Sequence, residues 1–403
     1  MKQKGLSASY LAWLNIQRKS ARSAGLIILV VMLSFVLFGG TILSVSLEKG
    51  LKSMKDRFGA DLIVVPLEYD KGMEAILLKG EPSCFYFKKL VGEKIAEVMG
   101  VSQVTTQFFL TSLSAECCDM PVQLIGFDPE TDFTVQPWIA QVYDGRISNG
   151  AVIIGNDINV EDEATIKFYD EDYKIAARLE KTGTGLDQAV FTNLDTMKKL
   201  FEGAKRSGLN FLGEVDPQYS ISSVLIKAED GYDRKTLIKD IREELGGVQI
   251  VETQSMITGI ANNIESYSMV IGIFAALFFI LTLAVLFLVF SITANERKKE
   301  FAVLRTLGAT RGRLTGTLLL EALYISTAGS IIGILVAAGI VFPFHVYIDD
   351  RLGLPYLQPE VKTIVIVLAV TFLVASGIGP FASVYSAVKI SRAETYLTMR
   401  EGE

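Results

Sequence analysis

Four apolar runs, each long enough to cross a lipid bilayer, constrain this chain of 403 residues more than any other feature. They lie at 24–45, 269–293, 317–342 and 363–388. About 20 apolar residues, each rising about 1.5 Å, cross a hydrocarbon core of about 30 Å. The stretch IGIFAALFFILTLAVLFLVF has no polar face to turn towards water, which excludes a buried helix of a soluble protein. The sequence therefore predicts an α-helical membrane protein with four transmembrane helices.

The distribution of charge predicts which segments face the cytoplasm. Lys and Arg gather in 1–23, in 294–314 and in the tail 389–403, and short basic segments of membrane proteins stay on the cytoplasmic side. Residues 46–268 instead hold 36 acidic and 23 basic residues, a net charge of −13. We expect a multi-pass membrane protein with both termini cytoplasmic and 46–268 extracytoplasmic.

Residues 46–268 alternate between two patterns, which predicts an α/β domain between the first and second transmembrane helices. Runs typical of strands lie at 62–65, 102–114, 121–128, 150–155, 164–169 and 219–228. Runs typical of helices lie at 87–100, 194–205 and 232–245. We expect helical stalks at 46–58 and 251–267. The remaining segments are a cytoplasmic amphipathic helix at 1–23, a cytoplasmic helix at 294–314, an external loop at 343–362 and the tail.

Missing motifs exclude several function classes. The chain contains no Gly-Lys dipeptide, so it has no phosphate-binding loop, and any ATP must be bound by a partner. With His345 as the single histidine, neither a Ser-His-Asp triad nor a multi-histidine metal site is expected. We expect a non-catalytic subunit with no cofactor of its own and no nucleic-acid partner.

The basic segment between the second and third apolar runs is regular enough to be a helix. In NERKKEFAVLRTLGATRGRL, Phe301, Leu304 and Gly308 share one helical face, and Gly308 is a helix stop. One interpretation is a docking surface for a partner. The alternative is a charged loop that only reflects the preference for basic residues on the cytoplasmic side.

The same segment, ERKKEFAVLRTLGAT, resembles the signature of the FtsX-like permease family of ABC transporters, the type of MacB and LolCE. SYLAWLNIQRKSARSAGLIILVVMLS resembles the family's first span, and PVQLIGFDP, DGRISNGAVIIGNDI and YKIAARLEKTGTGLDQAVFTNLDTMKKLF resemble its MacB-like core domain. GPFASVYSAVKISRAETYL resembles the end of the last span. The resemblance implies a location in the bacterial cytoplasmic (inner) membrane. It further implies an ABC ATPase subunit that binds ATP and Mg, and a second permease copy or paralogue. It also implies that the ATPase docks on the matching segment, with Glu296, Arg297, Glu300, Phe301, Leu304, Arg305, Leu307, Gly308 and Ala309.

Three cysteines and one acid inside a predicted span have no role in this scheme. Cys117 and Cys118 are adjacent, with Met120 beside them, and Cys84 is the third cysteine. They are open to three interpretations: structural or disulfide-bonded residues, a soft-metal or heme contact, or a redox relay. Glu321 lies inside the third span, where a charge costs roughly 2.5–3.5 kcal/mol at the centre. It is either a paired structural residue or a part of the transmission of motion.

A second resemblance bears on the cargo. GADLIVVP, GEPSCFYF and LIGFDPETDFTVQPWI are similar to permeases found with bacterial iron-uptake systems. That resemblance implies iron or heme handling and an extracytoplasmic iron-binding protein as a further partner. The alternative is a mechanotransmitter, or a unit that releases lipoproteins or peptides without a transmembrane conduit. A sensor acting through its ATPase is a third possibility.

Overall fold

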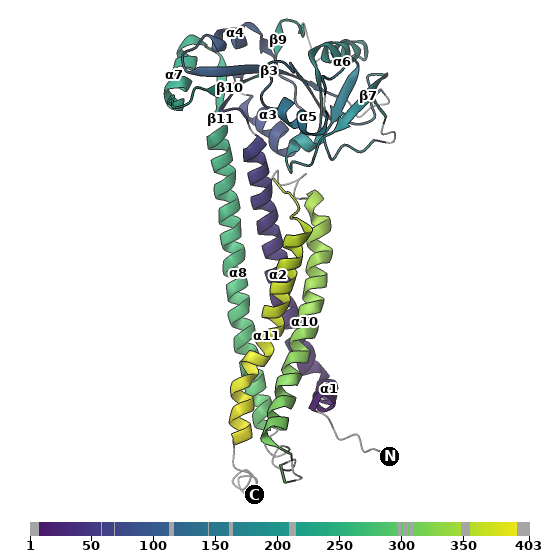
Figure 1. Ribbon diagram of the computed structural model, residues 1–403, viewed down its shortest axis with the longest axis vertical. Coiled ribbons are helices and arrows are strands. Elements are labelled where there is room, and N and C mark those ends of the chain that lie inside the picture. Colours follow the sequence, from purple (N-terminus) through teal and green to yellow (C-terminus); the bar gives the residue numbers. More distant parts are fainter. Residues whose placement is uncertain are drawn as a thin grey trace. The chain divides into compact units, whose positions relative to one another are not determined.

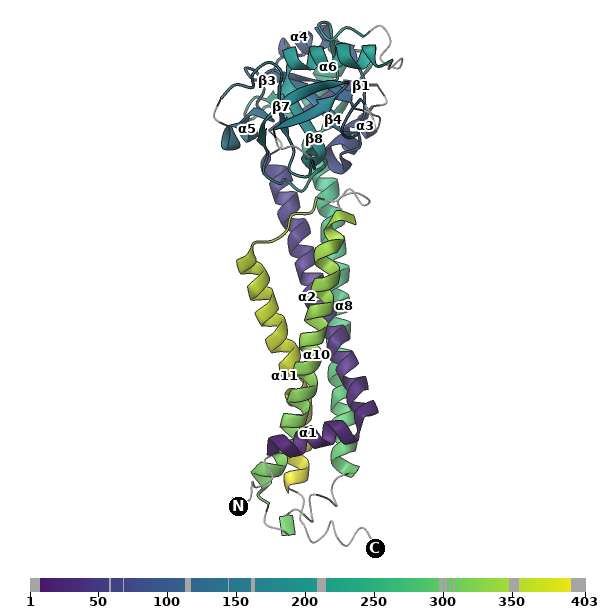
Figure 2. The same ribbon diagram turned by 90° about the vertical axis from the view of Figure 1, so that its right-hand side faces the viewer.

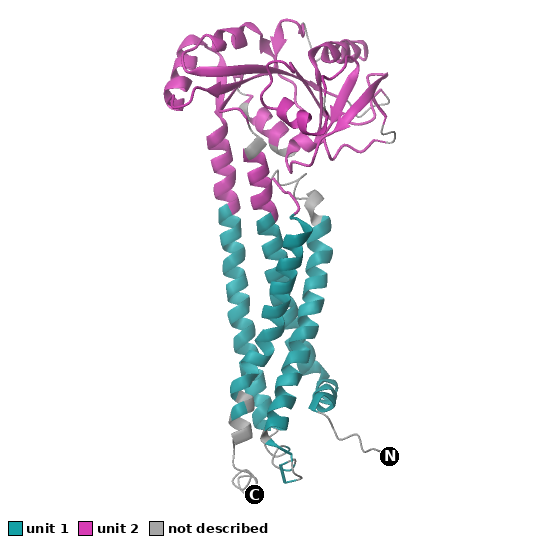
Figure 3. Ribbon diagram, viewed as in Figure 1, with its two compact units in different colours: residues 1–45, 265–344, 359–403 teal, residues 46–264, 345–358 magenta. Residues whose placement is uncertain are grey.

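The computed structural model describes residues 8–57, 59–67, 69–112, 117–143, 145–160, 164–208, 215–296, 309–347 and 355–392, together with Glu300, Val303, Arg305 and Thr306. The chain divides into two compact units, coloured separately in Figure 3. Unit 1 comprises 1–45, 265–344 and 359–403. Unit 2 comprises 46–264 and 345–358.

Long helices build unit 1, and four of them are long and apolar enough to span a membrane, as the sequence predicts. Their bounds are α2 Ser20–Arg57, α8 Thr253–Glu296, α10 Arg311–Tyr347 and α11 Val361–Arg392. The short helix α1, Ala8–Arg18, runs across these helices rather than along them (Figure 2). The expected helix at 1–23 therefore breaks at Lys19, and its last residues open α2. Helix α2 extends to Arg57 and α8 starts at Thr253, so each also contributes residues to unit 2.

The helices of unit 1 pack through apolar and small side chains. Leu26, Val30 and Leu33 of α2 share one core with residues of α8, α10 and α11. A Cβ added at Gly333 of α10 would lie 2.6 Å from the carbonyl oxygen of Val31. Small residues allow such backbone approach, which drives helix association where water is absent. Ser326 of α10 also donates a hydrogen bond of 2.7 Å to the carbonyl oxygen of Ser376 in α11.

A mixed sheet of nine strands forms the centre of unit 2, in the order β11-β1-β10-β3-β4-β8-β5-β7-β6 (Figure 1). The pairs β4–β8 and β5–β7 are parallel and the others antiparallel. The strands are β1 Leu62–Pro66, β3 Val101–Thr111, β4 Gln123–Phe127, β5 Ala151–Ile154, β6 Thr165–Phe168, β7 Glu171–Arg178, β8 Ala189–Asn193, β10 Ser223–Ala228 and β11 Val248–Glu252. A separate ribbon pairs β2 Phe87–Lys88 with β9 Ser220–Ile221.

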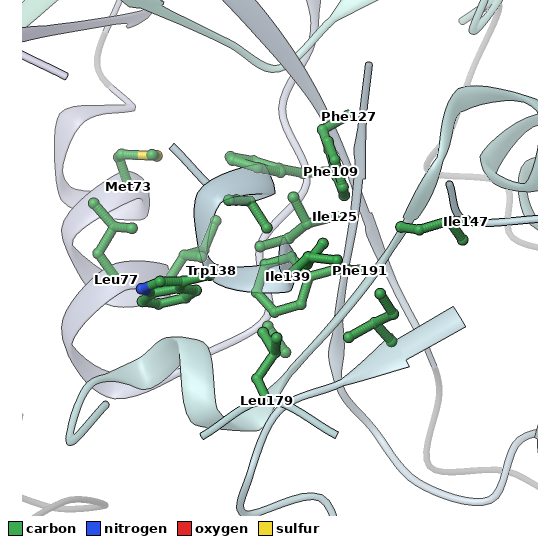
Figure 4. Close-up of a cluster of buried hydrophobic side chains, with 14 of the residues drawn as sticks. Met73, Leu77, Phe109, Ile125, Phe127, Trp138, Ile139, Ile147, Leu179 and Phe191 are labelled. Carbon is green, nitrogen blue, oxygen red and sulfur yellow. The ribbon is translucent and has the colours of Figure 1, made fainter. Parts of the chain in front are cut away.

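Successive residues of a strand point to opposite sides of the sheet, and the residues on both sides are buried, in separate cores. Phe109 and Phe191 belong to one core, with Trp138 of α5 (Figure 4). Their neighbours Phe108 and Val190 belong to a second core, which α6 covers. The helices of unit 2 are α3 Asp70–Glu74, α4 Leu90–Ala96, α5 Gln136–Val142, α6 Leu194–Arg206 and α7 Arg234–Glu244, with a π-helix η1 Ala75–Lys79 and a 3-10 turn η2 Gly185–Gln188.

The predicted α/β class is confirmed, and three details differ from the expectation. Strands β7, β8 and β11 form where no strand is expected. Strands β7 and β11 mix charged and apolar side chains, and the short β8 directly precedes the expected helix at 194–205. The second stalk helix starts at Thr253 instead of 251, since Val251 and Glu252 pair with β1. Part of the expected external loop at 343–362 belongs to unit 2.

Candidate functional site

Helices α1, α2, α8 and α10 of unit 1, with the turn between α1 and α2, bring together a set of polar side chains, here called the polar cluster. Its members are Asn15, Lys19, Arg22, Thr293, Glu296 and Glu321. The cluster forms because the chain turns at Lys19 between α1 and α2, which places basic side chains beside the end of α8. It lies next to the segment that the sequence predicts as the docking surface.

Glu321 is the centre of the polar cluster. Its side chain is fully buried, and its carboxylate accepts a hydrogen bond of 3.1 Å from Arg22 Nη2. Asn15 Nδ2 lies 3.4 Å from the other carboxylate oxygen. Arg22 Nη1 donates a further bond of 2.6 Å to Thr293 Oγ1 on α8. The buried charge of α10 is therefore paired, and the pair connects three helices.

A second ion pair of the polar cluster is exposed. Lys19 Nζ lies 2.9 Å from Glu296 Oε2, and the two side chains are 45% and 55% exposed. Exposed pairs contribute between 0 and about 1 kcal/mol. The pair still connects the α1–α2 turn to the docking segment, because Glu296 is the last residue of α8 and the first predicted docking residue.

The structure describes four of the nine predicted docking residues. Glu300 and Arg305 are helical, with Glu300 exposed. Ala309 packs beside Ala294 of α8 and Leu314 and Leu318 of α10. The remaining predicted docking residues, which lie outside the described residues, are Arg297, Phe301, Leu304, Leu307 and Gly308.

The three cysteines are free thiols in unit 2, so the structure contains no Cys84 disulfide. Cys117 Sγ and Cys118 Sγ lie 3.3 Å apart, and the backbone N–H of Tyr169 donates to Cys118 Sγ at 3.4 Å. Burial and the neighbouring Cys118 raise the pKa of the Cys117 thiol, and burial raises that of Cys84. The raised pKa values of Cys84 and Cys117 disfavour the thiolate form that binds metals.

A metal contact at Cys117, Cys118 and Met120 stays a prediction. Met120 packs against the same core as both cysteines. Within the described part of the chain, no group of three or more His, Cys, Asp or Glu side chains is arranged to hold a metal ion.

Residues Pro355–Gln358, between α10 and α11, form a strap in unit 2 that sequence reasoning missed. The Leu357 N–H donates a hydrogen bond of 3.1 Å to the Ser46 carbonyl of α2. Lys49 Nζ donates a hydrogen bond of 3.2 Å to the Gln358 carbonyl. Two glycines admit the strap: a Cβ at Gly50 would lie 2.3 Å from the Pro355 oxygen, and one at Gly183 would lie 2.5 Å from the Tyr356 oxygen. The sequence signal for this contact is Gly50, a glycine inside the predicted stalk helix at 46–58.

The strap rests on a turn organised by a buried carboxylate. Asp187 accepts hydrogen bonds from the backbone N–H groups of Thr182 and Gly183, at 2.7 to 3.0 Å. Burial raises the pKa of Asp187 to about 6, against the opposing effect of these hydrogen bonds. Gly183 has a φ of +71°, a left-handed conformation that favours glycine.

A small, partly open cavity lies in the same region of unit 2, among Met54, Met73, Phe109 and Trp138 (Figure 4 shows the last three). It has a volume of about 40 Å³ and its lining is mainly apolar. Sites for small molecules have volumes of roughly 300–1,000 Å³. This cavity is therefore a packing gap rather than a cargo site.

Comparison with known proteins gives one match to a family model and several similar solved structures. Residues 272–395, which include most of α8 and all of α10 and α11, match the family model described as FtsX-like permease C-terminal. A search of curated proteins finds no match. Among solved structures, the chain is similar to the periplasmic region of MacB from Actinobacillus actinomycetemcomitans, at 10% identity and a TM-score of 0.34, covering 53% of this chain and 98% of that chain. It is also similar to the extracellular domain of the ABC-type transporter YknZ from Gram-positive bacteria, at 14% identity and a TM-score of 0.29, covering 48% of this chain and 98% of that chain.

Proposed function

Because this chain belongs, through residues 272–395, to the FtsX-like permease family, we propose that it is the membrane subunit of an ATP-driven ABC transporter of the FtsX/MacB type. A separate ATPase subunit binds ATP and Mg and docks on the segment from Glu296 to Ala309. A second permease copy or a paralogue completes the membrane part. The docking segment and both termini face the cytoplasm, and unit 2 faces outwards.

The observation that carries the proposed mechanism is the polar cluster. Closure of the ATPase subunits moves the docking segment and with it the ends of α8 and α10. Through Arg22, the buried Glu321 of α10 and Thr293 of α8 are both held to α2. A displacement at the docking segment therefore reaches the helices that continue into unit 2.

The interior of unit 1 supports transmission of motion better than passage of a polar solute. Its described core is mainly apolar, with side chains such as Leu286, Phe290 and Ile325 packed together across the four helices. Among the described residues, the buried polar side chains of unit 1 are Ser and Thr, with Glu321 as the one buried charge. The charge of Glu321 is neutralised by Arg22. An aqueous path needs polar groups that face a cavity, since ionisable residues mark such paths. We therefore place the work of the transporter at unit 2.

The test is the ATPase activity of the complex in membrane discs. We expect the ATPase subunit to co-purify with the chain, and Arg22→Gln to lower permease-dependent ATP turnover severalfold while co-purification persists. Arg146→Gln, an exposed arginine in unit 2, is the matched control and should behave as the wild type. Failure of any ABC ATPase to bind the chain would refute the proposal.

Iron or heme handling, with an extracytoplasmic iron-binding protein as partner, is a second proposal about cargo. Its support is the pair of thiols 3.3 Å apart, with Met120 packed against the same core, because sulfur atoms are soft metal donors. The same complex is titrated with ferrous iron, ferric iron and heme. Stimulation that vanishes in a Cys117→Ser/Cys118→Ser variant supports a cargo contact. Equal ATP turnover with and without these ligands leaves release of lipoproteins or peptides, or mechanotransmission alone, as the function.

A further inference from the structure

A groove in unit 1 lies where α1, α2 and α8 meet. It has a volume of about 580 Å³. One wall is formed by Arg18, Lys19 and Arg22, and the other by Val289, Ile292 and Glu296 of α8. The groove thus joins a basic wall to the side of a membrane-spanning helix, and the ATPase proposal does not explain it.

The basic wall carries a charge that its own neighbours do not neutralise. Lys19 is paired with Glu296 and Arg22 with Glu321. Arg18 is exposed and makes no ion pair with the residues that the structure describes. A guanidinium offers several N–H donors in a fixed fork, which fits the oxygens of a phosphate group.

The surroundings of the groove match the boundary between lipid headgroups and acyl chains. Trp13 and Tyr10 on α1 are 54% and 53% exposed, and such aromatic side chains gather at membrane interfaces. Ile292, inside the groove, is 59% exposed on α8. A ligand here therefore meets an arginine at one end and apolar side chains of a membrane helix at the other.

We propose that this groove binds an anionic phospholipid, with the headgroup phosphate on Arg18 and an acyl chain along Val289 and Ile292. A soluble phosphate compound would satisfy Arg18 but leave the apolar wall exposed, whereas a zwitterionic lipid adds a cation that opposes the basic wall. The bound lipid holds the α1–α2 turn against the end of α8. It thereby stabilises the polar cluster, whose Lys19 and Arg22 line the same groove.

The experiment measures thermal unfolding and lipid retention of the full-length chain in detergent. Phosphatidylglycerol or phosphatidylcholine is added at equal mole fraction to the wild type, Arg18→Gln, Arg18→Lys and the control Arg146→Gln. We expect phosphatidylglycerol to raise the unfolding midpoint more than phosphatidylcholine in the wild type, the control and Arg18→Lys. In Arg18→Gln we expect roughly fivefold weaker retention of phosphatidylglycerol by native mass spectrometry, the loss of one cation near an anionic headgroup.

Two outcomes would overturn the inference. The first is an undiminished preference for phosphatidylglycerol in Arg18→Gln, which would assign the effect to the membrane charge in general. The second is an equal shift with soluble glycerol phosphate, which would show that the acyl chain is not recognised. No measurement involves an ATPase, so the result is independent of the proposed function.

Discussion

At the scale of single residues, the two ion pairs of the polar cluster each join a basic side chain to a glutamate, but one pair is buried and the other exposed. Arg22→Gln leaves the fully buried Glu321 without its cation, and breaking a buried pair in this way costs about 3 kcal/mol or more. Lys19→Gln breaks an exposed pair, which costs less than about 1 kcal/mol. We expect the unfolding midpoint in detergent to fall clearly for Arg22→Gln and little for Lys19→Gln.

A double-mutant cycle separates this pairing from other effects of Arg22. Arg22→Met combined with Glu321→Met removes both charges, and we expect much of the lost stability to return. Equal losses of stability in Arg22→Gln and Lys19→Gln would contradict the assignment of Glu321 as a buried partner. So would a double variant whose loss of stability equals the sum of the losses in Arg22→Met and Glu321→Met.

Asp187 predicts a pH dependence of the stability of unit 2. Burial raises its pKa from 3.8 to about 6, so the folded state retains a proton that the unfolded state releases. This contribution to stability is fully present below about pH 4 and is lost as the pH rises to about 6. Over that pH range we expect the unfolding free energy of the wild type to fall by about 3 kcal/mol relative to that of Asp187→Asn, whose side chain does not titrate.

The measurement is the unfolding free energy of the full-length wild type minus that of Asp187→Asn, between pH 4 and 7. Taking the difference cancels the carboxylates that both proteins share. A wild type that gains relative stability as the pH rises would show that the backbone hydrogen bonds from Thr182 and Gly183 outweigh burial at this site.

At the scale of elements, the strap depends on a helix position that lacks a side chain. A Cβ at Gly50 would lie 2.3 Å from the Pro355 oxygen, so Gly50→Ala must displace the strap or the helix, at a cost of about 1–3 kcal/mol. Gly259→Ala is the matched control, since it lies in α8 of the same unit with open space around it. Alanine there should stabilise the helix by about 0.4–1 kcal/mol.

Unfolding midpoints and limited proteolysis near Pro355–Gln358 distinguish the two variants. We expect Gly50→Ala to lower the unfolding midpoint and to speed cleavage near the strap. Gly259→Ala should neither lower the midpoint nor speed the cleavage. If both variants were stabilised alike, the contacts between the strap and α2 would not contribute to the fold.

The elements also show what sequence patterns can predict. Helices α6 and α7 have helical spacing and side-chain caps, Asn193 and Asp233, so local rules suffice. Strand β7, EDYKIAAR, is largely polar and exists because it pairs with β5 and β6. The strap joins Ser46 to Leu357, a contact between residues more than 300 positions apart that no local pattern encodes. The pairing of Glu321 was foreseen as one of two roles, but its partner Arg22 was not.

At the scale of the whole molecule, the proposed mechanism requires that α2 transmit motion between the residues of unit 1 and those of unit 2. Lys52 has an exposed side chain inside α2, so Lys52→Pro chiefly removes a backbone hydrogen bond and kinks the helix. The docking segment is untouched, and we expect ATP turnover of the complex to persist. We expect the ATP-dependent change in hydrogen exchange of unit 2 to be lost in Lys52→Pro and retained in Lys52→Ala. An unchanged exchange response in the proline variant would show that motion reaches unit 2 through α8 or the strap, and α2 would then serve as an anchor.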